Sequence, residues 1–208
     1  MIWLGVIGGI GSGKSFISRL FKSPVFNADK EVDFLYKNNL ECFKKLKKKL
    51  PKFIKSFPIS KSQLIKAINE DNKNLKRISS VVHPLVRKKL KSFLNKNKKN
   101  KIIVLDIPLL IENKLYNKKD ILIFVNSNQN KVINRLKKRK NYNKKILSNL
   151  RKNQANLLKK RKLSNYIVDN NFSPNIMKKK ISLLKNKILD ERNSTWHWNH
   201  GSFGKRWA

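Results

Sequence analysis

The chain has a glycine-rich segment directly after a short apolar run near its first residue. Residues 2–7 read Ile-Trp-Leu-Gly-Val-Ile, which is typical of a buried strand, and residues 8–15 read Gly-Gly-Ile-Gly-Ser-Gly-Lys-Ser. The second stretch completes a G-x-x-x-x-G-K-S pattern in the strand-to-helix context that this pattern requires. Glycines let the backbone turn tightly, so successive N–H groups point at one place, and the positive end of the next helix adds to them. The segment therefore predicts a loop that binds nucleotide phosphates.

Two side chains of this loop have predicted roles beyond those of its backbone. Lys14 is expected to reach the β- and γ-phosphates of ATP, while the Ser15 hydroxyl is suited to bind a Mg²⁺ ion that bridges them. A glycine-rich turn with an incidental lysine is the alternative, which the full spacing after an apolar strand disfavours. The residues predicted to bind the nucleotide are Gly9, Gly11, Ser12, Gly13, Lys14, Ser15 and Phe16.

Four further apolar runs are typical of buried strands, and helical patterns alternate with them. The runs cover residues 24–26, 102–105, 121–125 and 166–168. Amphipathic helical patterns cover residues 16–21, 30–50 (closed by Pro51), 61–69, 74–82, 84–94, 129–139, 143–162 and 173–189. This alternation predicts an α/β protein with a five-stranded parallel sheet flanked by helices, in which ligands bind at the carboxyl ends of the strands.

Two helical excursions interrupt the predicted strands. Residues 31–100 are almost wholly helical and too long for a simple crossover, so we interpret them as an insertion that binds an acceptor substrate. Residues 129–162 are rich in Arg and Lys, follow the fourth strand, and are interpreted as a lid. Residues 194–208 form a tail of different composition, to which we assign no function. Residues 1–193 are predicted to form a single domain. Outside the insertion and the lid, its residues 1–30, 101–128 and 163–193 form a nucleotide-binding core.

The charge of the chain is strongly positive. It has 50 Lys and Arg residues against 12 Asp and Glu residues, which gives a formal net charge of +38. Such a charge is typical of nucleic-acid-binding proteins, but here the lysines are spread among many Asn and Ile residues, as an AT-rich coding sequence would produce. We therefore interpret them as solvated faces, with no specific nucleic-acid partner and only weak, salt-sensitive binding to polyanions.

Cysteine content and hydropathy bear on the cellular setting. Cys42 is the only cysteine, so an intrachain disulfide or a thiolate zinc cluster is excluded. No apolar run approaches the roughly 20 residues of a membrane span, and the apolar run before the glycines lacks the basic leader of a secretory signal. The sequence predicts a cytoplasmic protein with no membrane association, and it leaves the oligomeric state open.

Two aspartates follow predicted strands. Asp106 comes after residues 102–105, in the pattern of the acidic residue that holds magnesium opposite a phosphate loop, and an Asp that caps the next turn is the alternative. Asp29 follows the second strand, where an acceptor hydroxyl must approach the γ-phosphate and a carboxylate could accept its proton. Because Asp29 also precedes a predicted helix, an N-cap role fits it equally well.

A basic pair and a His-Pro dipeptide are the other candidates. Arg135 and Arg139 lie four residues apart on a predicted helix, so both guanidinium groups project from one face. Such arginines are suited to neutralise the charge that spreads over a transferring phosphoryl group, although basic pairs also arise by chance in so Lys-rich a chain. His83 precedes Pro84, the expected first residue of a helix, and on spacing alone its role is structural.

Taken together, these segments make the chain similar to the dephospho-coenzyme A kinase family. The matching stretches are residues 7–15, 25–29, 82–87 and 104–112, followed in the family's order by residues 129–139, Gln154 and residues 166–170. Many kinases share the loop, whereas the His-Pro dipeptide and the Asp-x-Pro-Leu-Leu-x-Glu segment are far more specific together. The resemblance extends over all of the chain except its C-terminal tail.

This resemblance implies a P-loop kinase fold with a helical acceptor-binding insertion and a helical lid. It implies ATP-dependent, Mg²⁺-assisted phosphorylation of the 3′-hydroxyl of dephospho-coenzyme A. It favours Asp29 as the base over Asp29 as the cap, and it moves His83 towards the acceptor pocket. The implied catalytic residues are Asp29, Lys14, Arg135 and Arg139, the implied substrate-binding residues are His83, Asp106 and Leu109, and the implied metal-binding residues are Ser15 and Asp106.

The chain departs from the family pattern at several positions. Asn27 replaces the first Asp of the usual Asp-Ala-Asp, and Phe16 stands where Thr is common, so only Ser15 offers a hydroxyl to the metal. Two other functions remain as alternatives. One is another nucleoside or nucleotide kinase of the same fold, and the other is a nucleic-acid-binding P-loop NTPase.

Overall fold

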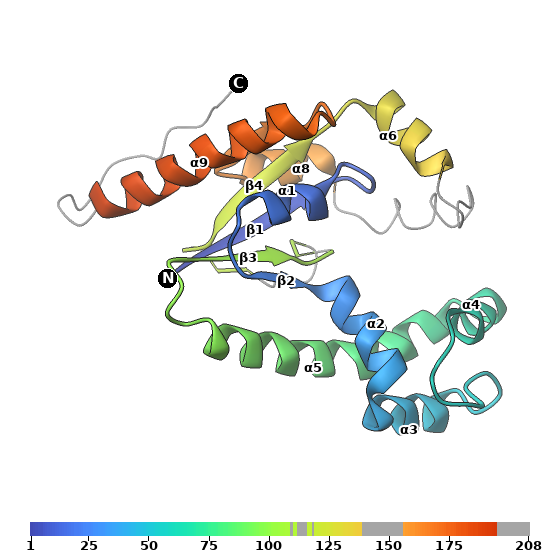
Figure 1. Ribbon diagram of the computed structural model, residues 1–208. Helices are drawn as coiled ribbons and strands as arrows, with labels where there is room; N and C mark the ends of the chain where they lie inside the picture. Colours follow the sequence, from blue (N-terminus) through green and yellow to red (C-terminus); the bar gives the residue numbers. More distant parts are fainter. Residues whose placement is uncertain (109, 112–115, 118, 139–155, 195–208) are drawn as a thin grey trace. The chain divides into compact units, whose positions relative to one another are not determined.

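The computed structural model describes residues 1–108, 110–111, 116–117, 119–138 and 156–194 (Figure 1). The chain divides into two compact units. One consists of Met1–Phe26 with Lys99–Ala208, and the other of Asn27–Lys98. We call them the sheet unit and the helical unit. That the helical unit binds the acceptor remains a prediction.

The sheet unit contains five strands, as the sequence predicts. They are β1 (Ile2–Gly8), β2 (Val25–Asn27), β3 (Ile102–Asp106), β4 (Ile121–Asn126) and β5 (Tyr166–Asp169), in the spatial order β2-β3-β1-β4-β5. β1 lies in the middle and pairs in parallel with β3 and with β4, and β4 pairs in parallel with β5. The central strands are almost wholly buried, which explains why they read as continuous apolar runs. The prediction of a parallel five-stranded sheet is confirmed.

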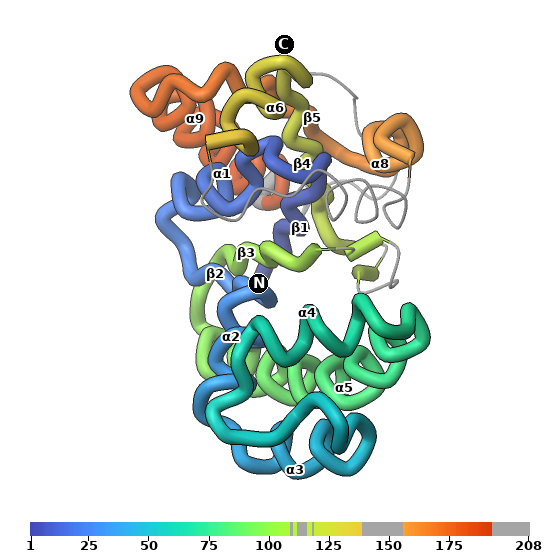
Figure 2. Tube along the Cα trace, turned by 90° about the vertical axis from the view of Figure 1, so that its right-hand side faces the viewer, coloured from blue at the N-terminus to red at the C-terminus, as the bar shows by residue number. Residues whose placement is uncertain are grey.

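Helices cover both faces of this sheet. They are α1 (Lys14–Leu20), α6 (Gln129–Lys137), α8 (Leu157–Leu163) and α9 (Pro174–Ser194). α1 packs against α9, and α8 packs against β1 and β4. The pair α1 and α9 lies on one side of the strands, and α8 lies on the other (Figure 2). The core between the sheet, α1 and α9 is apolar and includes Leu4, Ile17, Phe21, Val104, Ile123, Met177 and Ile181.

The helical unit has four helices around its own core. They are α2 (Ala28–Asn38), α3 (Leu40–Lys49), α4 (Lys61–Glu70) and α5 (Lys73–Lys96), and α5 contacts each of the other three. The core is a cluster of buried apolar side chains: Leu35, Cys42, Leu46, Leu50, Ile54, Ile59, Leu64, Ala67, Ile78, Val81, Val82 and Leu85. α4 begins with a capping box in which Ser60 and Gln63 satisfy each other's backbone N–H groups.

One helix over residues 30–50 was expected, and this prediction is wrong. The chain leaves the helical conformation at Asn39, whose φ is −112° and ψ is 103°. The Asn39 side chain accepts a hydrogen bond of 2.7 Å from the Cys42 amide, so Asn39 ends α2 and caps α3. Asn is among the strongest N-cap residues, and this local bond outweighs the continuity of the amphipathic pattern.

Two helices separated at His83 and Pro84 were also expected, and this prediction is wrong too. α5 runs without interruption through both residues. Proline inside a helix costs about 3 kcal/mol because it lacks an N–H group and crowds the preceding turn. α5 buries Val81 and Val82 before the proline and Leu85 after it. Burial of each such side chain contributes about 1.5–3 kcal/mol, so packing keeps the helix continuous.

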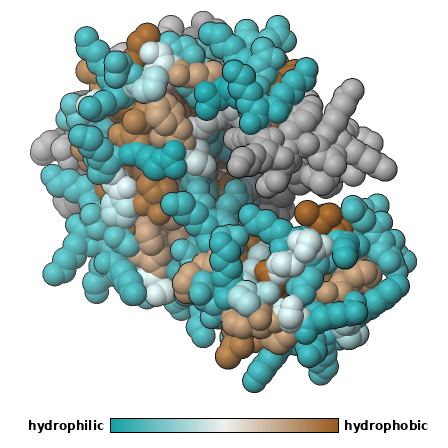
Figure 3. All heavy atoms as spheres, turned by 45° about the vertical axis from the view of Figure 1, so that its right-hand side comes forward, coloured by the Kyte–Doolittle hydropathy of each residue, from teal (hydrophilic) through white to brown (hydrophobic). Residues whose placement is uncertain are grey.

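The surface is rich in charge, in keeping with the composition. Hydrophilic side chains cover most of the described surface on the face drawn in Figure 3, with apolar side chains between them. No helix within the described residues is long and apolar enough to cross a membrane.

Candidate active site

The phosphate loop connects β1 to α1 and has the backbone conformation that its glycines allow. Gly11 and Gly13 have φ values of 79° and 94°, in the left-handed region that other residues rarely adopt. The Ser12 amide donates to the Gly9 carbonyl at 3.2 Å, which closes the turn, and the Phe16 and Ile17 amides donate to the Gly13 carbonyl at 3.0 Å. The loop is therefore formed as the sequence predicts.

Neighbouring groups lie so close to this loop that side chains would not fit at three of its glycines. A Cβ atom at Gly8 would lie 2.7 Å from the Val125 carbonyl oxygen. A Cβ atom at Gly11 would lie 2.9 Å from Val132 and 3.1 Å from Leu136, both on α6. At Gly13 it would lie 2.3 Å from Nδ2 of Asn170, after β5. Three positions of the loop thus require glycine for space as well as for conformation.

The polar side chains of the loop are suited to an anionic ligand. Nζ of Lys14 donates to the Gly9 carbonyl at 2.8 Å, so the ammonium lies against the loop. Ser12 is 2% exposed, and its Oγ has no hydrogen-bond partner within the described residues. A buried hydroxyl without a partner is unusual and costs stability, which is typical of a group that bonds to a ligand.

A pocket of about 500 Å³ lies beside the loop in the sheet unit. Its lining comes from the loop, the end of β4, and the N-terminal parts of α6 and α8, and includes Ile10, Ser12, Asn126, Gln129, Asn156 and Leu157. Pockets that hold small-molecule ligands have volumes of roughly 300–1,000 Å³. The buried Ser12 hydroxyl is among the groups that line it.

Asp106 lies at the same edge of the sheet as the loop. Leu105 pairs with Gly5, so Asp106, the last residue of β3, comes beside β1 shortly before the loop begins at Gly8. The Asp106 side chain is 3% exposed. Among the described residues no three His, Cys, Asp or Glu side chains come together as a metal site. The carboxylate of Asp106 and the hydroxyl of Ser15 are oxygen donors of the kind that suits Mg²⁺ when phosphate oxygens and water supply its other ligands.

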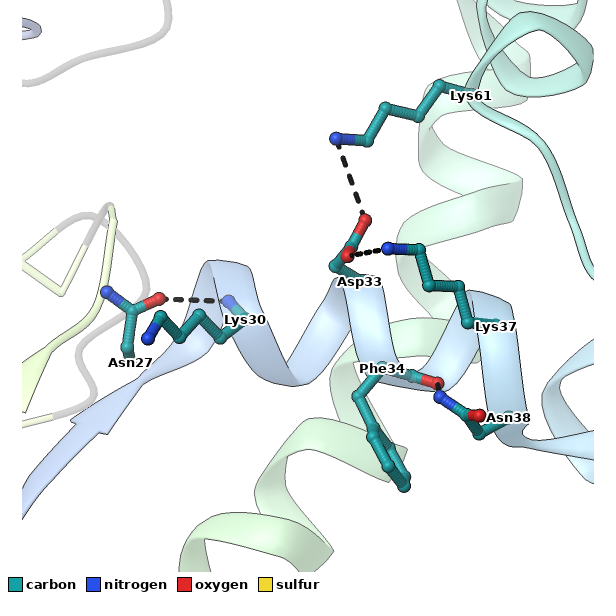
Figure 4. Close-up of polar contacts among 7 residues, drawn as sticks. All are labelled: Asn27, Lys30, Asp33, Phe34, Lys37, Asn38 and Lys61. Carbon is teal, nitrogen blue, oxygen red and sulfur yellow. Dashed lines mark hydrogen bonds and ion pairs between the residues drawn. The ribbon is translucent and has the colours of Figure 1, made fainter.

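The structure tests one of the two interpretations of Asp29, namely that Asp29 is the N-cap of α2. Asn27 is the N-cap of α2, and its Oδ1 accepts a hydrogen bond of 2.9 Å from the Lys30 amide (Figure 4). Asp29 lies in the first turn of α2 with an exposed side chain. The alternative of Asp29 as N-cap is therefore wrong, and the departure at Asn27 has a structural role. That Asp29 is the base stays a prediction.

The remaining candidates are placed only in part. Arg135 lies on α6 with its guanidinium 4.5 Å from the centre of the Phe172 ring. His83 is exposed within α5, and desolvation, followed by the charge of Arg87, lowers the pKa of its imidazole. Arg139 and Leu109 fall outside the residues that the structure describes, as do half of the predicted lid, residues 139–155, and residues 195–208 of the C-terminal tail.

Sequence reasoning assigned no role to two residues that contact the loop region. Asn170 is buried directly after β5 and donates a hydrogen bond of 2.8 Å to the Ser12 carbonyl. Phe172 has a φ of 66° and lies under Arg135. A polar Asn after a strand is also typical of an ordinary turn, so only the spatial meeting of the end of β5 with the phosphate loop reveals the contact.

Comparison with known proteins agrees with this geometry. A family model described as dephospho-CoA kinase matches residues 2–175. A dephospho-CoA kinase of Wolbachia pipientis is 34% identical over 175 residues, which cover 82% of this chain and 89% of that protein. One from the Wolbachia of Brugia malayi is 33% identical with the same coverage.

Solved structures share the fold. The crystal structure of TT1252 from Thermus thermophilus has a TM-score of 0.74 at 24% identity and covers 91% of this chain and 97% of that one. Dephospho-CoA kinase from Campylobacter jejuni has a TM-score of 0.61 at 20% identity, with 89% and 96% coverage. With the family match over most of its length, the chain belongs to the dephospho-CoA kinase family.

Proposed function

We propose that the protein transfers the γ-phosphate of ATP to the 3′-hydroxyl of dephospho-coenzyme A and so completes coenzyme A. The observation that carries this proposal is a fully formed phosphate loop in a chain that belongs to this family. In the reaction a bond forms between the 3′-oxygen and the γ-phosphorus, the bond to the β,γ-bridging oxygen breaks, and ADP leaves.

The loop is suited to bind the triphosphate. Its backbone amides, the Lys14 ammonium and the buried Ser12 hydroxyl offer donors and positive charge from one short segment. Phosphoryl transfer depends mainly on positioning and on neutralising charge, and a preformed loop supplies both without reorganisation.

Ser15 and Asp106 are the residues that would hold Mg²⁺. A bound Mg²⁺ ion neutralises phosphate charge and favours departure of ADP. Asp106 would also contribute to substrate binding, together with His83 and Leu109. These roles rest on the family resemblance and on the position of Asp106 at the loop edge of the sheet.

Asp29 is the proposed base, and Arg135 and Arg139 the proposed arginines around the transferred phosphate. The Asp29 carboxylate would accept the proton of the 3′-hydroxyl, and the guanidinium groups would neutralise the charge that develops. The lowered pKa of His83 leaves its imidazole neutral at neutral pH, so it would contact the acceptor by hydrogen bonding rather than as a cation. A cytoplasmic location belongs to the same proposal.

An acceptor assay tests the function. The purified full-length chain is mixed with ATP and Mg²⁺ and with dephospho-coenzyme A, a panel of nucleoside monophosphates, or single-stranded RNA, and ADP release is measured with the phosphorylated product. We expect turnover with dephospho-coenzyme A to exceed turnover with every other acceptor. Faster phosphorylation of a nucleotide, or ATP hydrolysis that RNA stimulates without an acceptor, would overturn the proposal.

A further inference from the structure

Asn170 connects the end of β5 with the phosphate loop. We propose that it is a positioning residue, whose side chain sets the direction in which the Gly13 amide donates to a phosphate of ATP. This inference rests on the ATP-dependent function proposed above. In this role Asn170 affects the binding of ATP. It acts through the backbone of the loop and does not contact the reacting atoms.

Three hydrogen bonds hold Asn170 in one place. Its backbone amide donates to the Asn126 carbonyl of β4 at 2.8 Å. Its side-chain Oδ1 accepts from the Phe172 amide at 2.9 Å, which leaves Nδ2 to point at the loop. Nδ2 then donates to the Ser12 carbonyl at 2.8 Å, and Asn170 is only 3% exposed. Because each end of the carboxamide has a partner, the side chain cannot turn without losing a buried bond.

The bond to Ser12 orients the next amide. A peptide group is planar and trans, so its C=O and N–H bonds point in opposite directions. When Asn170 fixes the Ser12 carbonyl, it also fixes the Gly13 N–H, which points away from Asn170. Within the described part of the chain this N–H donates to no backbone acceptor. It is therefore available to an anionic ligand of the loop, in a direction that is set before the ligand arrives.

The geometry at Gly13 supports the same conclusion independently. A Cβ atom there would lie 2.3 Å from Nδ2 of Asn170, well inside any contact that atoms tolerate. Asn170 thus packs directly on the Cα atom of Gly13 and fills the space that a side chain would take. With a φ of 94°, Gly13 would otherwise have wide freedom, and the carboxamide restricts it.

Two neighbouring asparagines allow a matched test. Asn170→Asp keeps the acceptor for the Phe172 amide but loses the donor to Ser12 and adds a negative charge. Asn171→Asp adds the same charge one residue away, where the exposed Asn171 Oδ1 only accepts from the Ser173 amide at 3.0 Å. Asn170→Ser is the second test variant, since a serine hydroxyl can still accept from the amide two residues on but is too short to reach Ser12.

The primary measurement is the Kd of each full-length variant for a non-hydrolysable ATP analogue, with the thermal unfolding midpoint recorded in parallel. We expect Asn170→Asp and Asn170→Ser to raise the Kd about tenfold or more, the effect of losing one well-oriented donor. Asn171→Asp is expected to change it less than about twofold. In turnover, KM for ATP should rise for the Asn170 variants while KM for dephospho-coenzyme A stays the same.

A pH profile separates positioning from a general loss of structure. Burial at this position, where Asn170 is 3% exposed, should raise the pKa of an introduced carboxyl, and a protonated carboxyl regains one O–H donor. The affinity of Asn170→Asp for the analogue should therefore recover towards that of the wild type as the pH is lowered from about 8 to about 5. Asn171→Asp should show no recovery relative to the wild type.

The outcomes are distinct. Kd values for the Asn170 variants within about twofold of the wild type would overturn the inference. So would unfolding of both variants below the assay temperature, since Asn170 would then hold the fold and not the loop. If the wild type binds the analogue but phosphorylates no dephospho-coenzyme A, the proposed function fails, and the Kd comparison still decides the role of Asn170.

Discussion

The phosphate loop of the sheet unit depends on main-chain conformation, whereas the helical unit depends on the packing of side chains. In the sheet unit, the loop depends on backbone conformation, with Gly11 and Gly13 in the left-handed region and neighbours too close for a side chain. In the helical unit, buried apolar side chains hold four helices together. Few residue types satisfy the first requirement, whereas many satisfy the second.

This difference determines where sequence changes are tolerated. A loop that works through its amides cannot exchange its glycines, so the G-x-x-x-x-G-K-S pattern is intact. In the helical unit, Asn27 replaces an acidic residue of the family pattern and still caps α2. Substitutions in the loop should therefore weaken the use of ATP, and substitutions in the helical core should weaken the stability of that unit.

The largest expected effect is that of Lys14→Ala. Loss of the ammonium should lower kcat about 10²- to 10³-fold, as for other groups that stabilise charge in a transition state. The unfolding midpoint should change little, because Lys14 is not part of the apolar core. Arg19→Ala, which removes an exposed cation from the same helix, is the control and should retain wild-type turnover. A kcat of Lys14→Ala close to that of Arg19→Ala would show that Lys14 does not stabilise the transition state.

Leu46→Ala tests the helical unit. Leu46 is fully buried in its core, so the substitution should lower the free energy of unfolding by about 2–5 kcal/mol. Leu40→Ala in the same helix is the control, since Leu40 is 57% exposed and should cost less than about 0.5 kcal/mol. Denaturant unfolding measures both, and the Kd for an ATP analogue should stay unchanged where Leu46→Ala is folded. A similar loss for the two variants would mean that the apolar cluster does not stabilise this unit.

Asp29→Asn tests the proposed base. If the carboxylate accepts the acceptor proton, kcat should fall about 10²-fold while KM for ATP changes little. Asp33→Asn, one turn further along α2, makes the same change at a half-buried position and should leave kcat unaltered. Steady-state kinetics with each substrate varied in turn distinguishes the two. Equal kcat values for both variants would show that Asp29 is not the base.

The smallest effect concerns the surface of the helical unit. Asp33 forms ion pairs with Lys37 at 2.7 Å and with Lys61 at 3.6 Å (Figure 4). The hydrogen bond from Lys37 is the main cause that lowers the pKa of Asp33 below its ordinary value of 3.8. A carboxyl with a lowered pKa stabilises the fold above the pKa of the unfolded chain, and this contribution is lost as the pH falls through the folded pKa.

We therefore expect the Tm of the wild type to be slightly higher than that of Asp33→Asn at neutral pH, by a difference that shrinks as the pH falls below about 4 and is reduced in about 1 M salt. Thermal unfolding at several pH values measures it. A difference that stays constant across this range would mean that the ion pairs do not contribute.

Much of the fold follows from local pattern. The five strands begin and end within about two residues of the predicted runs, because strands buried on both faces must be apolar throughout. The helical predictions failed at Asn39, at Pro84 and at Asn156, which lies within the predicted helix of residues 143–162. At Asn39 and Asn156 a capping bond interrupts a pattern that could have continued, and at Pro84 core packing keeps a helix that local propensity would end. In each case two contributions of similar size compete.

By itself the sequence determined the phosphate loop, the parallel sheet and the family. Only the tertiary structure decided that Asn27 and not Asp29 caps α2, and that Asn170 meets a loop 158 residues earlier in the chain. The physical reason is that a phosphate loop needs glycine at fixed local spacing, and this spacing is present in the sequence itself. The partner of a buried carboxamide, in contrast, depends on which strands become neighbours, and that is settled by packing over the whole unit.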